Sequence, residues 1–265
     1  MKKIIGFLAA TLIFIGMGFA VKRYIEGPSQ SVNGFMISGT KEDVSAVKEL
    51  YKGQTAQTEN YQYKLVTEIK KQEETAEQKE ATKKEWKEKG ANMTEEEMDK
   101  RIEEMSITKK QYAVITKSTA EKFLKKGILR TNVGNEGSLI SSPLKEIKEL
   151  ASDKNLFYME SEATDEIMDG KLNLNGQMVP VQQIKQNIWI GYFSSPVVIV
   201  NDETYKQLQE KEVNLSLIQF TKENFDYKNK NKLNMVVENI SKVYDVKEEN
   251  ENYDKDKLSF VEVQN

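Results

Sequence analysis

The residues of this chain that could support hydrolytic chemistry are serines with a lysine three positions later. This spacing occurs at Ser38, Ser45, Ser106 and Ser142. On a helix it places the hydroxyl and the amine one turn apart, so that an uncharged amine could accept the hydroxyl proton. Serine and lysine are both frequent here, however, so a few such spacings are expected by chance, and no Lys-Thr-Gly segment accompanies them. A Ser–Lys hydrolase is therefore the least favoured of the functions considered below.

Acidic residues are the second possible source of chemistry. They gather in two segments, residues 160–169 and 245–256. A calcium-loop pattern that begins at Asp165 places Ile167 at its third position and Gly176 at its twelfth, where such a loop needs oxygen ligands. We therefore expect solvated acidic loops, and a hydrolase that uses paired carboxylates stays open only as an alternative.

The chain contains no cysteine and no histidine. Disulfides, thiol nucleophiles, triads with an imidazole base and His- or Cys-ligated metals are thereby excluded. Glycine-rich phosphate-binding patterns are missing as well. The balance of 39 basic and 42 acidic residues, a formal charge of −3, argues against a nucleic-acid-binding surface. We predict a protein that is not an enzyme, with no catalytic, cofactor-binding or metal-binding residues.

Residues 1–21 have the pattern of an export signal. The stretch Ile4 to Val21 carries no charge, and basic residues flank it on both sides. Its 18 residues are close to the lower limit of about 17 for a helix that spans a bilayer. The stretch is therefore predicted to be either a membrane anchor or a signal peptide cleaved after Ala20. A buried core helix is the alternative. Since no cysteine follows the apolar run, we expect no lipid anchor on this sequence.

Residues 22–31 are predicted to form a linker, which leaves residues 32–265 as an extracytoplasmic α/β domain. Alternating strands and helices indicate an α+β (mixed α/β) fold built from strand–helix–strand units. Asn175-Gly176 predicts a type I′ hairpin over residues 171–181, with Pro180 at an edge or a bulge. The other predicted strands are 32–38, 61–67, 112–116, 156–160, 196–200, 215–220 and 258–263. The predicted helices are 41–51 with Thr40 as cap, 118–127 with a capping box of Ser118 and Glu121, 143–150 from Pro143, one after Asn201-Asp202, and 233–243.

A segment at about residues 70–105 differs in character from its surroundings, because lysine and glutamate crowd it. Gly90-Ala91-Asn92 interrupts the segment, and Thr94 with Glu97 forms a capping box that starts a second helix. We predict an inserted charged arm of two helices, a short coiled-coil hairpin. Its functional interpretation is a partner-binding arm, and the alternative is a solvated or partly disordered surface insertion.

The C-terminal half carries a family likeness. The hairpin KLNLNGQMVPV at 171–181 is followed by PVVIVNDETYKQL at 196–208, by LSLIQF and by an amphipathic helix. YAVITKSTAEKFLKKG at 112–127 has the same strand–cap–helix shape. Over residues 110–245 this pattern resembles the extracytoplasmic domain of FtsX/MacB-type ABC permeases. The whole chain is also similar to small uncharacterised Bacillus cell-envelope proteins of the lipoprotein type, although the acylated cysteine is missing.

The permease likeness implies a free-standing sensor or accessory domain on one anchor, because no second apolar run of membrane-spanning length follows Val21. We therefore expect a non-enzymatic cell-envelope protein, attached to the membrane through residues 4–21, that binds a partner such as an ABC permease. Its expected location is the extracytoplasmic face of the cell membrane, or the medium if the chain is cleaved after Ala20. The alternative is a structural envelope protein without a defined ligand.

Overall fold

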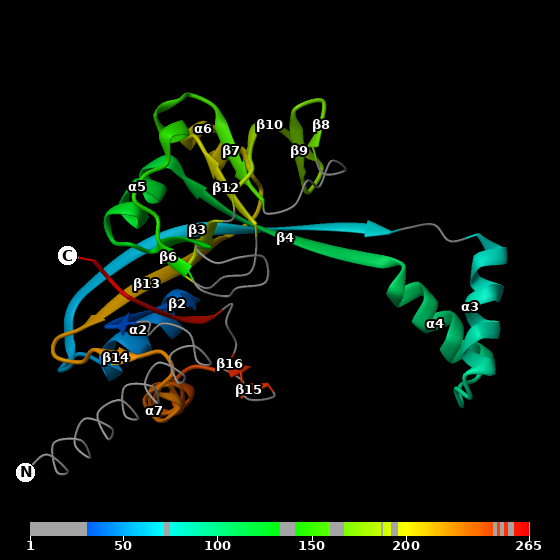
Figure 1. Ribbon diagram of the computed structural model, residues 1–265, viewed down its shortest axis with the longest axis horizontal. Helices are drawn as coiled ribbons and strands as arrows, with labels where there is room; N and C mark the ends of the chain where they lie inside the picture. The colour runs from blue at the N-terminus through cyan, green and yellow to red at the C-terminus, as the bar shows by residue number, and fades with distance from the viewer. Residues whose placement is uncertain are drawn as a thin grey trace, which may run out of the picture.

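The computed structural model describes residues 31–71, 75–132, 141–159, 167–186, 188–191, 196–245, 248–249, 252–253 and 257–264. The predicted export segment, most of the linker, the acidic residues 160–166 and most of the acidic run 245–256 therefore lie outside the described residues. Figure 1 shows a body built around one large sheet, with two strands that continue beyond the body as a ribbon and end in a pair of helices.

The described residues form six α-helices and a mixed set of sheets, as the predicted α+β class requires. The helices are α2 (Lys41–Leu50), α3 (Ala76–Glu88), α4 (Glu95–Met105), α5 (Lys117–Lys125), α6 (Asp202–Gln207) and α7 (Lys230–Ser241), with a 3₁₀ turn at Lys148–Ala151.

The first nine strands are β1 (Ser31–Val32), β2 (Gly34–Gly39), β3 (Thr55–Lys71), β4 (Ile107–Thr116), β5 (Leu129–Asn132), β6 (Ser141–Pro143), β7 (Asn155–Tyr158), β8 (Ile167–Met168) and β9 (Lys171–Leu174). The remaining strands are β10 (Gln177–Ile184), β11 (Ile188–Ile190), β12 (Val197–Val200), β13 (Glu212–Phe220), β14 (Phe225–Asp226), β15 (Glu248–Glu249), β16 (Asn252–Tyr253) and β17 (Leu258–Val261).

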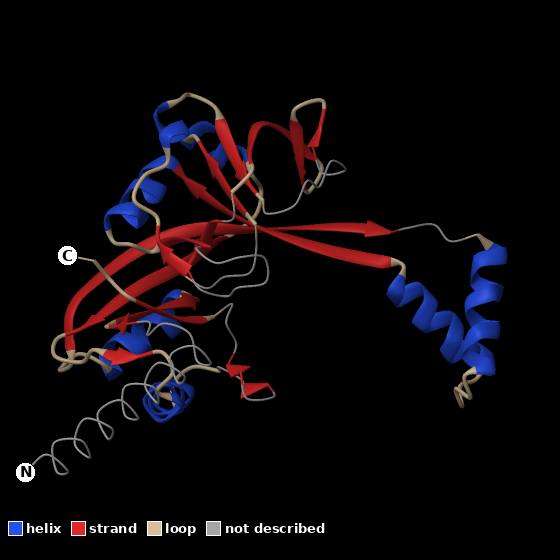
Figure 2. Cartoon of the chain, in the orientation of Figure 1, coloured by secondary structure: helices blue, strands red, loops and turns tan. Residues whose placement is uncertain are grey.

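Ten of these strands make one sheet in the order β17-β2-β13-β3-β4-β12-β7-β10-β9-β8. The pairs β4–β12 and β7–β10 are parallel, and the other neighbours are antiparallel. Helices lie on both sides of the long strands, whereas α3 and α4 stand apart at the end of the ribbon (Figure 2). Small sheets β11-β5-β6, β1-β14 and β15-β16 complete the fold.

The two faces of the sheet are covered differently. One face carries Tyr61, Tyr63 and Ile115 and is packed by α5 and by the strands of the β11-β5-β6 sheet. The opposite face carries two separate clusters, one beneath α2 and α7 around Phe35, and one beneath α6 and β9 around Tyr112. Buried β-branched and aromatic side chains in central strands explain why this sheet forms.

The turns and caps confirm much of the local prediction. Asn175 and Gly176 have φ values of 52° and 90°, as a type I′ hairpin between β9 and β10 requires. The side chains of Thr40, Thr94 and Asn201 cap α2, α4 and α6 by accepting backbone N–H groups.

Two predicted helices are wrong in detail. The helix expected to have Ser118 as its N-cap begins two residues earlier, at Lys117, because Thr116 is the N-cap and accepts the N–H of Thr119. The helix expected from Pro143 to Leu150 is absent. Residues 141–143 instead pair with β5, and only a 3₁₀ turn follows at 148–151. A proline can end a strand that forms few ladder bonds, and β6 has three residues.

Candidate functional site

The arm is the feature of the fold that leaves the body, and we define it as residues 69–109. It begins where β3 and β4 run on as an antiparallel ribbon, with Ile69 opposite Lys109 and Lys71 opposite Ile107. The sequence predicted a strand only over residues 61–67, whereas β3 extends over 17 residues. Most of its last residues are charged, and they gain their order from pairing with β4, which is a contact between segments about 40 residues apart.

Two capped helices form the tip of the arm, as predicted. Thr75 with Gln78 and Thr94 with Glu97 make reciprocal capping boxes at the starts of α3 and α4. Between them Gly90 adopts a φ of 78°, and its N–H bonds to Lys87 O at 3.0 Å, while Ala91 N–H bonds to Trp86 O at 2.9 Å. These two bonds make a Schellman motif, which reverses the chain directly after α3.

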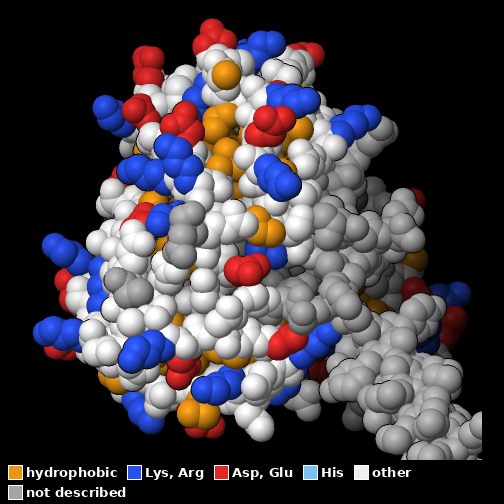
Figure 3. All heavy atoms as spheres, turned by 60° about the vertical axis from the view of Figure 1, so that its left-hand side comes forward, with side chains coloured by type: hydrophobic (Ala, Val, Ile, Leu, Met, Phe, Trp, Pro, Cys, Tyr) orange, Lys and Arg blue, Asp and Glu red, His pale blue; other side chains and the backbone are white. Residues whose placement is uncertain are grey.

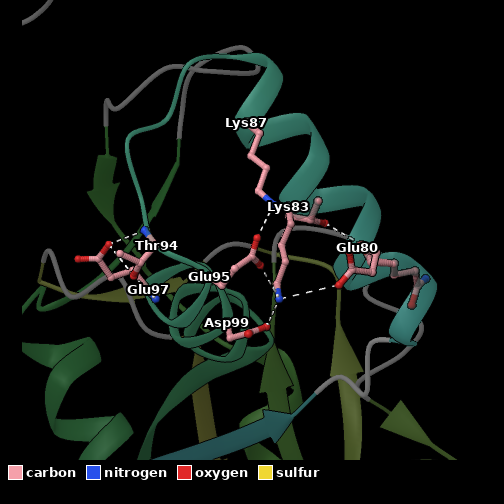
Figure 4. Close-up of polar contacts among 9 residues, drawn as sticks. Glu80, Lys83, Lys87, Thr94, Glu95, Glu97 and Asp99 are labelled. Carbon is pink, nitrogen blue, oxygen red and sulfur yellow. Dashed lines mark hydrogen bonds and ion pairs between the residues drawn. The ribbon is translucent and has the colours of Figure 1, made fainter.

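The two helices are joined by an ion-pair network centred on Lys83 (Figure 4). The Lys83 side chain is only 9% exposed, and its ammonium lies 2.6 Å from Asp99 Oδ1 and 3.3 Å from Glu95 Oε2, both on α4. Glu80, on the same helix as Lys83, is 3.9 Å away, and Lys87 also pairs with Glu95. The hydrogen bond to Asp99 is the main cause that raises the pKa of Lys83. A lysine side chain that is largely covered thus brings its ammonium to carboxylates of the facing helix that are themselves more than half exposed, and these contacts link the two helices.

Helix α4 buries apolar side chains in the tip, and α3 buries fewer. Met98 and Ile102 of α4 are 1% and 2% exposed, and the Arg101 guanidinium lies 5.8 Å from the centre of the Trp86 ring. On α3 the only buried side chain is that of Lys83. A coiled coil needs an apolar seam on both helices, so that part of the prediction is not supported.

Two large apolar side chains are exposed near the base of the tip. Ile69 on β3 is 62% exposed, and Met105 at the end of α4 is 64% exposed. The body surface that faces the viewer in Figure 3 mixes lysines with acidic side chains, and its apolar patches are small and separate. Large exposed apolar side chains on a projecting element are candidates for contact with another molecule.

The serines of two Ser–Lys spacings, Ser45 within α2 and Ser106 at the C-cap of α4, bond to backbone carbonyls and not to the lysine amines. Ser45 donates its hydroxyl proton to Lys41 O at 2.7 Å, while Lys48 donates to Asn60. The Ser106 hydroxyl donates to Glu103 O at 2.7 Å. Within the described part of the chain, no group of three acidic residues is arranged to hold a metal ion. Asp165 itself lies outside the described residues.

Comparison with known proteins identifies the family. The profile of the uncharacterised lipoprotein family matches residues 32–250. The chain belongs to this family. A crystal structure at 1.5 Å of a candidate lipoprotein from Bacillus anthracis has a similar fold, with a TM-score of 0.50, 15% sequence identity and coverage of 88% of this chain and 99% of that one. No curated protein matches the chain.

Membership of a lipoprotein family indicates a membrane-anchored, extracytoplasmic location, in agreement with the export pattern of the sequence. It also supports the likeness to envelope lipoproteins noted above, while the permease likeness stays a prediction. The missing cysteine makes this chain a departure from the lipoprotein pattern. In the described part of the chain, every helix is too short or too polar to cross a bilayer.

Proposed function

We propose that this family member is a non-enzymatic envelope protein that holds a protein partner with its arm. The observation that carries the proposal is the buried Lys83 between the helices of the tip. An ordered ion-pair network, two capping boxes and a Schellman turn are not expected of a partly disordered insertion. These features together support a tip with a fixed shape, and a fixed shape on a projecting element favours recognition.

The position of the arm suggests where the partner lies. The described chain begins at β1, which pairs with β14 on the side of the body away from the arm tip (Figure 1). If residues 4–21 hold the protein at the membrane, the tip reaches away from the point where the chain leaves the bilayer. We therefore infer a partner with an extracytoplasmic part. An ABC permease, suggested by the likeness of residues 110–245, is the first candidate.

The test is to remove the arm without disturbing the body. Glu68 and Lys110 are directly opposite each other in the ribbon, so residues 69–109 can be replaced by Asn-Gly, which forms a two-residue hairpin turn. Cross-linking in intact cells should then recover a partner with the wild-type protein and lose it with the deletion, while thermal unfolding of the body is unchanged. A photo-crosslinker at the exposed Lys100 should reach the same partner, and one at the exposed Lys145 on the body should not.

Capture of the same partner by the deletion variant would refute the role of the arm. Recovery of no partner even with the wild-type chain would favour the structural alternative. Recovery of residues 4–21 in the membrane fraction would support the anchor over cleavage after Ala20.

A further inference from the structure

A polar strip runs across the middle of one sheet face, between the two apolar clusters under α2 and α6. The register of β3 and β13 places Asn60 opposite Ser216 and Gln62 opposite Asn214, all on this face. Side chains alternate along a strand, so these residues share a face with Ile218 on one side and with Val66 on the other. Asn60 and Gln62 are exposed although β3 is a central strand. Central strands are normally covered, so this part of the sheet is left open for a reason other than packing.

The strip is the floor of a groove. A cavity of about 590 Å³ lies over it, walled by α2 on one side and by α6 on the other, and bounded at one end by the first turn of α5. A second cavity of about 410 Å³ continues the groove toward Thr55 and shares Ser45 and Lys48 with the first. The first volume alone is in the range of ligand sites. From Thr55 to Gln62 the floor is about 23 Å long at roughly 3.3 Å per residue, which fits an extended chain of several residues.

The charge of the groove differs from that of the arm. Four lysines line the larger cavity: Lys41, Lys48, Lys122 and Lys206. Among the described residues none of them lies within 4.0 Å of a carboxylate oxygen, although Glu59 acts electrostatically on Lys122. The acidic lining residues of this cavity are Asp202 and Glu212, and Glu49 of the second cavity is engaged by Lys52. In the arm, by contrast, the lysines at 71, 83, 84, 87 and 89 are all paired with acidic residues. The larger cavity therefore has an excess of positive charge, with four lysines against two carboxylates, on a protein whose overall charge is −3.

The floor adds groups that can bond to a peptide. The carbonyl oxygen of the Asn60 side chain accepts from Lys48 and from the Ser216 hydroxyl, the latter at 2.7 Å. Partial burial lowers the pKa of Lys48, so an anion beside it would relieve a cost that the free protein bears. The Gln62 amide can both donate and accept, whereas the Asn214 amide already donates to Gly39 O at 3.4 Å and keeps one N–H and its oxygen for a peptide. A peptide backbone has both kinds of group, whereas a phosphate polymer has acceptors only.

We propose that this groove binds an extended acidic peptide segment of another protein. The lysines of the walls pair with its carboxylates, and the amides of the floor bond to its backbone. The site lies on the body and does not depend on the arm, so it is independent of the function proposed above.

The probe for the test is the peptide acetyl-Glu-Ser-Glu-Ser-Glu-Ser-amide, measured by saturation-transfer NMR with the full chain in non-ionic detergent. Its controls are the same peptide with Gln for Glu, and a short polyphosphate of equal charge, which has no protons to observe and is therefore measured by how strongly it displaces the acidic peptide. We expect the acidic peptide to bind about tenfold more tightly than the Gln peptide, because several exposed charge pairs form together.

Two triple variants remove the same number of charges from different places. The groove variant is Lys41→Gln, Lys48→Gln and Lys206→Gln, and the matched arm variant is Lys84→Gln, Lys89→Gln and Lys100→Gln. The groove variant should lose about tenfold in affinity for the acidic peptide, and the arm variant should bind like the wild type.

Equal binding of the Glu and Gln peptides, or equal loss in both variants, would overturn the proposal. Tighter binding of polyphosphate than of the peptide would overturn it in favour of a phosphate polymer. Loss in the groove variant alone, with preference for the peptide, would support it.

Discussion

Met98 tests whether the tip of the arm is a folded unit in its own right. Its side chain is 1% exposed and lies one turn from Ile102 on the buried side of α4. Replacing a buried Met by Ala costs about 2–5 kcal/mol in lost burial and cavity formation. The helices of the tip have 13 and 11 residues, and isolated helices shorter than about 12–15 residues are marginal in water. We therefore expect Met98→Ala to unfold the tip locally and to leave the body folded.

Hydrogen exchange followed by mass spectrometry measures this directly. A loss of 2 kcal/mol in opening free energy speeds exchange about 30-fold, and a larger loss removes protection entirely. Peptides within residues 76–105 should show this change, while those covering β12 should not. Met235→Ala is the matched control, since Met235 is 56% exposed on α7 and its loss should change little. Faster exchange in β12 as well, or unchanged exchange in the tip, would refute the reasoning.

Two further predictions concern pH and close packing. Hydrogen bonds from Lys87 and Lys83 lower the pKa of Glu95 from its ordinary 4.5, so its contribution to the tip is present above that value and lost as the pH falls through the lowered pKa. Protection of residues 76–105 should therefore fall below about pH 4.5, with a smaller step in Glu95→Gln, and the same step in both would contradict this. A Cβ at Gly34 would lie 2.6 Å from Ile218 O, whereas one at Gly53 would meet nothing within 4 Å. In urea unfolding, Gly34→Ala should cost about 1–3 kcal/mol and Gly53→Ala less than about 0.5 kcal/mol; equal effects would show that β2 can move away from β13.

The sequence predicts those turns and helix ends that depend on residues close together in the chain. Asn175-Gly176 specifies its hairpin because both residues tolerate positive φ. Thr94 specifies the start of α4 because its partner Glu97 is three residues away. The prediction of Ser118 as the cap of α5 was wrong because a second hydroxyl, that of Thr116, stands two residues earlier. Strand β4 ends at Thr116, and the end of the strand determines which of the two hydroxyls is the cap.

The candidate sites depend on contacts that no local pattern contains. Lys83 has the sequence environment of a solvated lysine, and it is buried only because α4 folds back with Asp99 opposite it. The polar residues of β3 alternate with Tyr61 and Tyr63, so the strand itself was predicted. The face of β3 that carries these polar residues is uncovered because α2 and α6 lie on either side of it. The positions of the two helices follow from the order of ten strands in the sheet, which no local pattern contains.

The contrast between paired and unpaired lysines leads to a last prediction, on ionic strength. Lys83, Lys84, Lys87 and Lys89 of the tip are paired with carboxylates of the arm. We therefore expect the arm to recognise its partner mainly by shape and by side chains such as Ile69 and Met105. We expect the lysines of the groove to pair with the carboxylates of a bound peptide. Raising the salt concentration from 0.1 M to 1 M shortens the Debye length from about 10 Å to about 3 Å. Peptide binding in the groove should therefore weaken several-fold in saturation-transfer NMR, while partner capture by the arm in a pull-down should change little. Equal sensitivity of both to salt would show that the arm also binds through charge, and that its internal ion pairs open when the partner arrives.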